Sequence, residues 1–127
     1  MTDGVLADTQ IVVWWLLDDE RLPAAARELI DDGDVPVYVS AASVWEAAIK
    51  VGTNKLRVPT DDLPADLERE GFDLLPVTPA DGWAVRELPH HHNDPFDRLI
   101  VAQAQAAGLP VLTVDPAFRA YDVDVLA

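Results

Sequence analysis

Residues 94–116 read DPFDRLIVAQAQAAGLPVLTVDP. Asp94 is typical of a helix N-cap, and Pro95 suits the first position of the helix that follows. The stretch predicts a long helix up to Ala107, which Gly108 ends. The apolar run at 111–114 then predicts a buried strand, followed by Asp-Pro and a short helical turn. A helix that leads directly into a buried strand is the repeating unit of an α/β sheet.

The same alternation extends through the rest of the chain. Further strands are expected at 5–7, 35–39, 72–77 and 123–126. Helices are expected at 9–17, 21–32, 61–70 and 79–88, and from an N-cap at Ser40 through residue 50. This order predicts an α/β fold with parallel strands. Because 127 residues fit one domain and leave little room for two, we expect a single domain over 1–127.

Composition restricts the classes of function. Nine basic and 23 acidic residues give a net charge of −14, which argues against a long nucleic-acid-binding surface. The negative charge is still compatible with a compact site in which metal ions neutralise carboxylates and a phosphate. It is also compatible with a basic protein partner. The sequence has no cysteine, no apolar run long enough for a membrane span and no signal-peptide pattern, so we expect a cytoplasmic protein that does not act at a membrane.

Acidic residues occupy positions where a parallel sheet places its ligands. Asp8 and Asp115 follow predicted strands, so both are expected at the carboxyl edge. Asp97 lies in the first turn of its predicted helix, and Glu46 lies within the helix that Ser40 caps. Each residue alone also has a structural explanation. An Asp after a strand is often an N-cap, an Asp in a first turn complements the helix dipole, and a Glu among alanines often faces solvent.

The joint pattern favours a metal site. If the four carboxylates meet at one edge, their repulsion must be offset by protons or cations. Carboxylate oxygens are preferred ligands of Mg²⁺ and Mn²⁺, and a pair of such ions can promote phosphodiester cleavage. Ser43 is a candidate to orient Glu46 or a metal-bound water, or to bond only to backbone. Thr9 and Thr113 are candidate supporting donors, although Thr113 also suits a simple strand position.

Four stretches together carry a family resemblance: VLADT at 5–9, SAASVWEAAIK at 40–50, HHNDPFDRLIVAQA at 91–104 and LTVDPAF at 112–118. In this order and over essentially the whole chain, they resemble the PIN domain of VapC-type toxins. The Trp-Glu pair at 45–46 and the block at 94–98 make the resemblance specific, whereas Asp-Thr at 8–9 would be weak alone. One departure is Gln10, where relatives often have a small or β-branched residue; it concerns the fit of the first helix.

The resemblance implies a three-layer α/β/α fold with a central, mainly parallel sheet. It also implies a Mg²⁺- or Mn²⁺-dependent endoribonuclease that acts on RNA, and a homodimeric toxin that a cognate antitoxin holds inactive. The acidic positions of the family fall on Asp8, Glu46, Asp97 and Asp115, with Asp94 as a candidate fifth.

Basic residues near these motifs have two interpretations each. Arg98 is predicted to hold a ligand carboxylate or phosphate, or else to form a surface ion pair. Lys50, Lys55 and Arg57 form a local basic concentration that either guides RNA or simply ends a solvated helix.

Two further motifs are interpreted structurally. Consecutive side chains rarely reach one ion, so residues 90–92 (His-His-His) are expected in a loop near the site and not in a zinc centre. The helix at 11–17 is apolar on all sides, which predicts core packing plus a dimer contact or antitoxin groove.

Three other classes remain as alternatives. A phosphotransfer receiver or aspartate-based phosphatase would use a strand-end Asp, but such sites typically want a lysine late in the chain, and none follows Lys55. A non-catalytic module would bind a basic partner through the acidic edge. A PIN nuclease of RNA processing would share the site without being a toxin.

Overall fold

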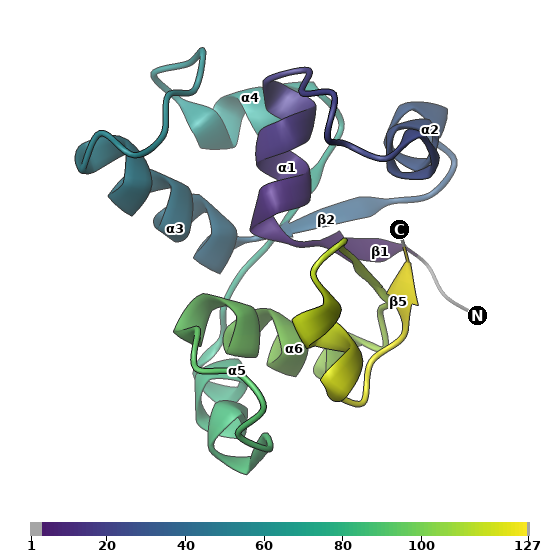
Figure 1. Ribbon diagram of the computed structural model, residues 1–127, viewed down its shortest axis with the longest axis vertical. Coiled ribbons are helices and arrows are strands. Elements are labelled where there is room, and N and C mark those ends of the chain that lie inside the picture. Colours follow the sequence, from purple (N-terminus) through teal and green to yellow (C-terminus); the bar gives the residue numbers. More distant parts are fainter. Residues whose placement is uncertain (1–3, 127) are drawn as a thin grey trace.

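The computed structural model describes residues 4–126 and is built on a five-stranded parallel sheet (Figure 1). The strands are β1 (Val5–Ala7), β2 (Val37–Ser40), β3 (Asp73–Leu75), β4 (Val111–Leu112) and β5 (Val125–Leu126), in the spatial order β3-β2-β1-β4-β5. The α-helices are α1 (Thr9–Leu16), α2 (Ala24–Asp32), α3 (Ala41–Gly52), α4 (Leu63–Arg69), α5 (Pro79–Ala84) and α6 (Pro95–Ala107). Two 3₁₀ helices are η1 (Val85–Glu87) and η2 (Pro116–Ala120).

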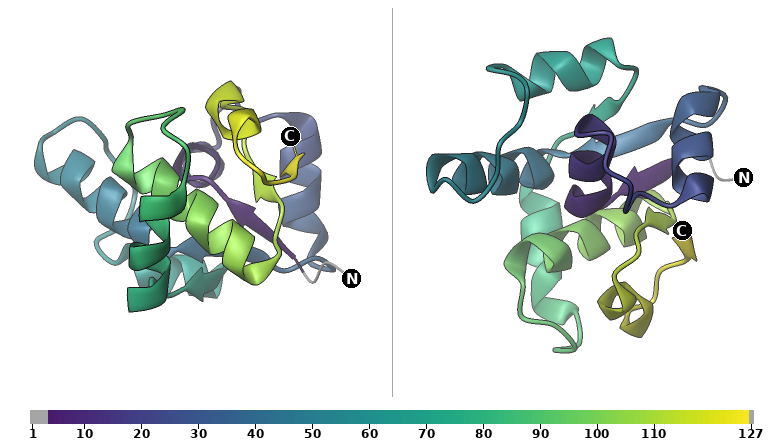
Figure 2. Two further views of the ribbon diagram at one scale, coloured as in Figure 1. Left: turned by 90° about the horizontal axis from the view of Figure 1, so that it is seen from below. Right: turned by 45° about the horizontal axis from the view of Figure 1, so that its top comes forward.

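The sheet lies between two helical layers because successive strand residues point to opposite faces. Val5 and Ala7 pack into one apolar cluster, together with residues of α1, α2 and α4. Leu6 between them packs into a second cluster, with residues of α6 and η2. Figure 1 shows α1, α2 and α4 on one side of the sheet and α5 and α6 on the other, and Figure 2 shows the same layers from two further directions. The predicted α/β/α architecture is therefore confirmed.

At the carboxyl edge of the sheet, β1 and β2 lead directly into helices. Asp8 follows β1 and caps α1, since its side chain accepts a hydrogen bond from the backbone N–H of Ile11. Ser40 ends β2 and caps α3 in the same way. Helix α3 projects beyond this edge, so the edge is flanked by α1, α3 and the start of α6 (Figure 1).

The structure shortens some predicted elements for local reasons. The predicted helix at 21–32 begins only at Ala24, because Pro23 is the N-cap and Arg21 is held in a turn by Asp19. The strand predicted at 111–114 ends at Leu112, because the Thr113 hydroxyl accepts a hydrogen bond from the backbone N–H of Asp115 and the chain turns there. The helix predicted at 79–88 divides into α5 and η1.

The strands predicted at 35–39, 72–77 and 123–126 and the helix predicted at 61–70 are also shorter in the structure. Helix α6 has its predicted bounds, with Asp94 as the N-cap and Gly108 in the left-handed conformation at the end. Between residues 4 and 126, no helix combines the length and the hydropathy of a membrane span.

Candidate metal-binding active site

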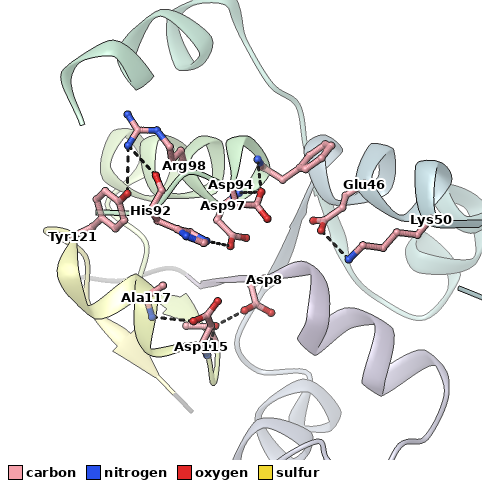
Figure 3. A network of polar contacts seen from close by, with 12 residues as sticks. Asp8, Glu46, Lys50, His92, Asp94, Asp97, Arg98, Asp115, Ala117 and Tyr121 are labelled. Atoms are coloured by element: carbon pink, nitrogen blue, oxygen red, sulfur yellow. Dashed lines mark hydrogen bonds and ion pairs between the residues drawn. The ribbon is translucent and has the colours of Figure 1, made fainter. Parts of the chain in front are cut away.

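A cleft of about 450 Å³ opens at the carboxyl edge and collects the predicted acidic residues. Its lining contains the carboxylates of Asp8, Glu46, Asp94, Asp97 and Asp115. They come from the end of β1, from α3, from the start of α6 and from the end of β4, and Figure 3 shows their side chains around a common space. Segments that are far apart in sequence thus meet at one edge, as a parallel topology predicts.

Asp8 is the most buried carboxylate of the cleft, with 4% of the residue exposed. One oxygen accepts the Ile11 N–H at 2.9 Å, and the other accepts a short hydrogen bond from the Thr113 hydroxyl. Burial raises the pKa of Asp8 above its ordinary value, and the negative charges of Asp115 and Glu46 add to the rise. The two hydrogen bonds oppose this rise, so Asp8 is fixed in place while its charge is disfavoured.

Asp97 faces Asp8 from the first turn of α6. Burial raises the pKa of Asp97 to about 6, against an opposing hydrogen bond from His92. The negative charges of Asp94 and Glu46 contribute to this rise of the pKa. Asp94 itself caps α6 by accepting the backbone N–H groups of Phe96 and Asp97. Asp94 therefore has the structural role expected of it and also lines the cleft.

Glu46 is buried although it belongs to the helix that projects from the sheet. Its Oε2 forms an ion pair with Lys50 at 3.0 Å, one helical turn along α3. Its Oε1 is buried and has no hydrogen-bond partner among the described residues. A buried carboxylate oxygen without a partner is costly, which suggests that a ligand completes this site.

Asp115 closes the cleft on the β4 side. Its carboxylate accepts the backbone N–H of Ala117 and thereby caps η2. Its own N–H bonds to the hydroxyl of Thr113, which donates in turn to Asp8. Thr113 thus links the Asp8 carboxylate to the backbone of Asp115.

The two other candidate hydroxyls do not contact a carboxylate. Thr9 donates to Ser43 at 2.8 Å, and both residues are buried. This pair joins the start of α1 to the start of α3. Within residues 4–126 the Ser43 hydroxyl bonds to Thr9 and makes no hydrogen bond to backbone or to Glu46, and its contact with a metal-bound water stays a prediction.

Both sequence interpretations of Arg98 are wrong. The residue is buried, and its guanidinium donates to the backbone carbonyls of Val85, Leu88 and Pro89 at 2.8–3.3 Å. Weaker contacts reach the His92 carbonyl and the Tyr121 hydroxyl. No carboxylate of the described residues pairs with it. Arg98 instead fixes the loop that follows η1, because the charged group finds its acceptors in the carbonyls left free there.

Three cations line the cleft, and one of them was missed from sequence. Lys50 and Lys55 lie there as expected, whereas Arg57 is exposed outside the lining residues. Arg21 also lines the cleft, held by Asp19 and stacked over the Trp14 ring at 5.3 Å. The sequence interpretation placed Arg21 in a helix, so its position at the cleft was not predicted. Asp19, which favours a turn, and Pro23, which favours a helix start, were the signals that Arg21 precedes the helix.

The histidine run lies in a loop near the site, as expected, but one of its members joins the acidic residues: His92, Asp94 and Asp97 offer metal-ligand atoms that all lie within 4.8 Å of one another. Only His92 reaches the cleft carboxylates; His91 packs edge-on against Tyr121, and His90 is exposed.

The first helix serves mainly the protein's own core. Ile11, Val12 and Val13 are buried, and Trp15 packs against Phe72. Its predicted second role, in a dimer contact or antitoxin groove, stays a prediction. Gln10 is exposed and lines the cleft, so it does not disturb the packing of the helix.

One known protein is similar to this chain in sequence. The chain is 29% identical over 119 residues to Ribonuclease VapC22 of Mycobacterium tuberculosis (strain ATCC 25618 / H37Rv), covering 92% of this chain and 91% of the relative.

Solved structures share the fold. The structure of VapBC2 from Rickettsia felis, bound to a DNA fragment from its promoter, matches with a TM-score of 0.70 and 12% identity, covering 96% of each chain. FitAcB from Neisseria gonorrhoeae matches with a TM-score of 0.66 and 24% identity, covering 97% of this chain and 96% of that one. The family model described as the PIN domain matches residues 5–124, so the chain belongs to the PIN-domain family.

Proposed function

We propose that this protein is a metal-dependent endoribonuclease and the toxin of a toxin–antitoxin pair. The observation that carries the proposal is the convergence of Asp8, Glu46, Asp97 and Asp115 on one cleft. The relative named Ribonuclease VapC22 supports the reaction class, and the structural neighbours from VapBC and FitAcB support the cellular role. Hydrolysis of RNA phosphodiester bonds is therefore the activity we assign.

The residues present fit a hard divalent cation. The donor set is made of carboxylate oxygens, which Mg²⁺ and Mn²⁺ prefer. The partnerless Oε1 of Glu46 and the raised pKa values of Asp8 and Asp97 point to a positive charge that belongs in the cleft. Asp8, Glu46, Asp97 and Asp115 would hold the ion, with Asp94 beside them. Such an ion supplies Lewis acidity, activating a water and stabilising charge on the phosphate.

The chain itself supplies orientation. Thr113 and the Ile11 N–H hold Asp8, and Lys50 holds one oxygen of Glu46, so these carboxylates are set before a ligand arrives. Thr9 and Ser43 tie α1 to α3 behind them.

The basic side chains at the cleft allow RNA to bind to this acidic protein. Arg21 and Lys55 are exposed at the cleft, where each can contact a phosphate of the backbone. Because the net charge of −14 repels RNA elsewhere, this local cluster favours binding at the site over binding at other surfaces. Arg57 is not in the lining, so we assign it no part in this contact.

We further propose a cognate antitoxin, a homodimer and a cytoplasmic location. A solved structure with the same fold, from Klebsiella pneumoniae, is described as a toxin–antitoxin complex. An acidic chain also suits a basic antitoxin segment. A pull-down with the product of the neighbouring gene tests the antitoxin, and light scattering tests the dimer.

An RNA cleavage assay with the purified protein tests the enzymatic proposal. Cleavage is expected with added Mg²⁺ or Mn²⁺ and is expected to stop with chelator, with Asp8→Asn and with Glu46→Gln. Arg57→Gln is the matched control, since it changes a charge near the cleft without touching its lining. Unchanged cleavage by Asp8→Asn would sink the mechanism, and no cleavage of any RNA would favour a non-catalytic binding module.

Expression in cells tests the toxin role separately. Growth arrest that the neighbouring gene's product relieves supports a toxin. Cleavage without growth arrest would instead assign the protein to RNA processing.

A further inference from the structure

The side chain of His92 comes from the loop before α6 and contacts Asp97, a carboxylate that lines the cleft. Its Nε2 lies 2.8 Å from Oδ2 of Asp97, and the two side chains are 30% and 17% exposed. Figure 3 shows the imidazole reaching Asp97 from the side opposite Glu46. Within the described residues, this is the one side-chain hydrogen bond that the Asp97 carboxylate makes.

Hydrogen bonds from Arg98 hold the loop that carries His92. Arg98 follows Asp97 in α6 and donates to the carbonyls of Leu88 and Pro89, with a longer contact to the carbonyl of His92 itself. Neighbouring His91 packs on the ring of Tyr121. One turn of α6 therefore presents Asp97 to the cleft and, through Arg98, fixes the loop whose imidazole meets that carboxylate.

Asp97 needs such a contact more than the other carboxylates do. Asp8 is held by two hydrogen bonds, Asp115 by the N–H of Ala117, and Glu46 by Lys50. Asp97 lies beside the charges of Asp94 and Glu46, which repel it, and no backbone N–H fixes its carboxylate. Without His92, repulsion favours rotation of the carboxylate away from the cleft.

We propose that His92 is a positioning residue that holds Asp97 in the orientation required for metal binding, a claim that rests on the proposed metal site. The imidazole occupies Oδ2 and leaves Oδ1 of Asp97 for the cation. Hydrogen-bond partners behind metal ligands typically change metal affinity by about 10–100-fold when removed. In this proposal His92 acts through Asp97; because its ring nitrogen also lies within 4.8 Å of ligand atoms of Asp94 and Asp97, direct ligation is the competing outcome of the test.

Calorimetric titration of Mn²⁺ alone into the metal-free protein, without RNA, tests this role. His92→Ala is expected to weaken Mn²⁺ binding by about 10–100-fold. His92→Gln keeps an N–H donor at a similar reach, so it is expected to restore affinity to within about threefold of the wild type. His90→Ala, an exposed neighbour in the same run, is expected to bind as the wild type does. Thermal unfolding of each variant without metal confirms that it is folded.

The outcomes separate the two proposals. If the wild type binds no Mn²⁺, the proposed metal site fails and the role of His92 falls with it. If the wild type binds Mn²⁺ and His92→Ala binds equally well, only the role of His92 is overturned. If His92→Gln binds as weakly as His92→Ala, the imidazole is a direct ligand and the positioning role is wrong.

Discussion

Replacing Asp97 with Asn is expected to stabilise the metal-free protein and to abolish metal binding. The substitution removes the ionisable group but keeps the size of the side chain and a group that can bond to His92. In the wild type, burial raises the pKa of Asp97 from 3.8 to about 6, and the charges of Asp94 and Glu46 add to the rise. Ionising this carboxyl therefore opposes folding when no cation is present.

The magnitude follows from the pKa. One pKa unit corresponds to about 1.4 kcal/mol, so the rise to about 6 weakens folding by about 3 kcal/mol once Asp97 is ionised. The side chain is only 17% exposed, so solvent screens this effect little. The pKa of Asp97 is higher in the folded protein than in the unfolded chain. The contribution of Asp97 to the stability of the protein is therefore present in full below about pH 4 and is lost as the pH rises through about 6.

Urea unfolding in the presence of chelator, between about pH 4 and pH 8, measures this effect. Near pH 4 the two proteins are expected to have similar free energies of unfolding, because Asp97 is protonated in the folded state and only about half ionised in the unfolded state. Near pH 8 the Asn variant is expected to be more stable by up to about 3 kcal/mol. Added Mn²⁺ is expected to reverse the order, because only the wild type gains stability from binding.

Asp61→Asn is the matched control, since Asp61 is exposed and outside the cleft. Its difference from the wild type is expected to stay small and nearly independent of pH. The reasoning is refuted if the Asp97 variant is no more stable than the wild type near pH 8, or if the difference between them does not change with pH.

Three other substitutions test separate contacts. Thr113→Val removes the donor to Asp8, which leaves a buried carboxylate oxygen unpaired, and should lower the free energy of unfolding by about 1–3 kcal/mol in urea; an unchanged midpoint would show that water replaces the hydroxyl. Arg98→Met leaves several buried carbonyls without a donor and should destabilise by about 3 kcal/mol or more, seen as a lower melting temperature, whereas a surface role predicts almost no shift. Arg21→Gln, measured for RNA binding in the non-cleaving Asp8→Asn background, should reduce the slope of log affinity against log salt by about 0.7; an equal slope would remove Arg21 from the contact with RNA.

The chain's local signals determined the order and type of its elements. The stretch at 94–108 specified α6 by itself. The N-cap and the proline at its start and the glycine at its end each act only on the helical turn beside them. Asp8 and Asp115 could be placed at the carboxyl edge for a similar reason, since Asp8 directly follows β1 and Asp115 comes shortly after the end of β4. Their places in predicted helices added Glu46 and Asp97 to the candidate set before the family resemblance implied the same four residues, and both line the cleft.

Contacts between distant segments were decided only by the tertiary structure. Thr113 bonds to Asp8 across 105 residues, and Thr9 bonds to Ser43 across 34. Which donor meets which acceptor at such separations depends on how the helices pack on the sheet, and no local pattern encodes it. Arg98 shows the same limit, because its burial against backbone carbonyls follows from the path of the loop after η1.

Sequence by itself therefore determined a parallel α/β sheet with carboxylates at one edge, because caps and strand ends are set by hydrogen bonds between near neighbours. Tertiary structure alone decided that Arg21 enters the cleft, that Arg98 is buried and that His92 meets Asp97. These side chains are long or lie on loops, so their positions are fixed by packing between elements and not by the residues beside them in the chain.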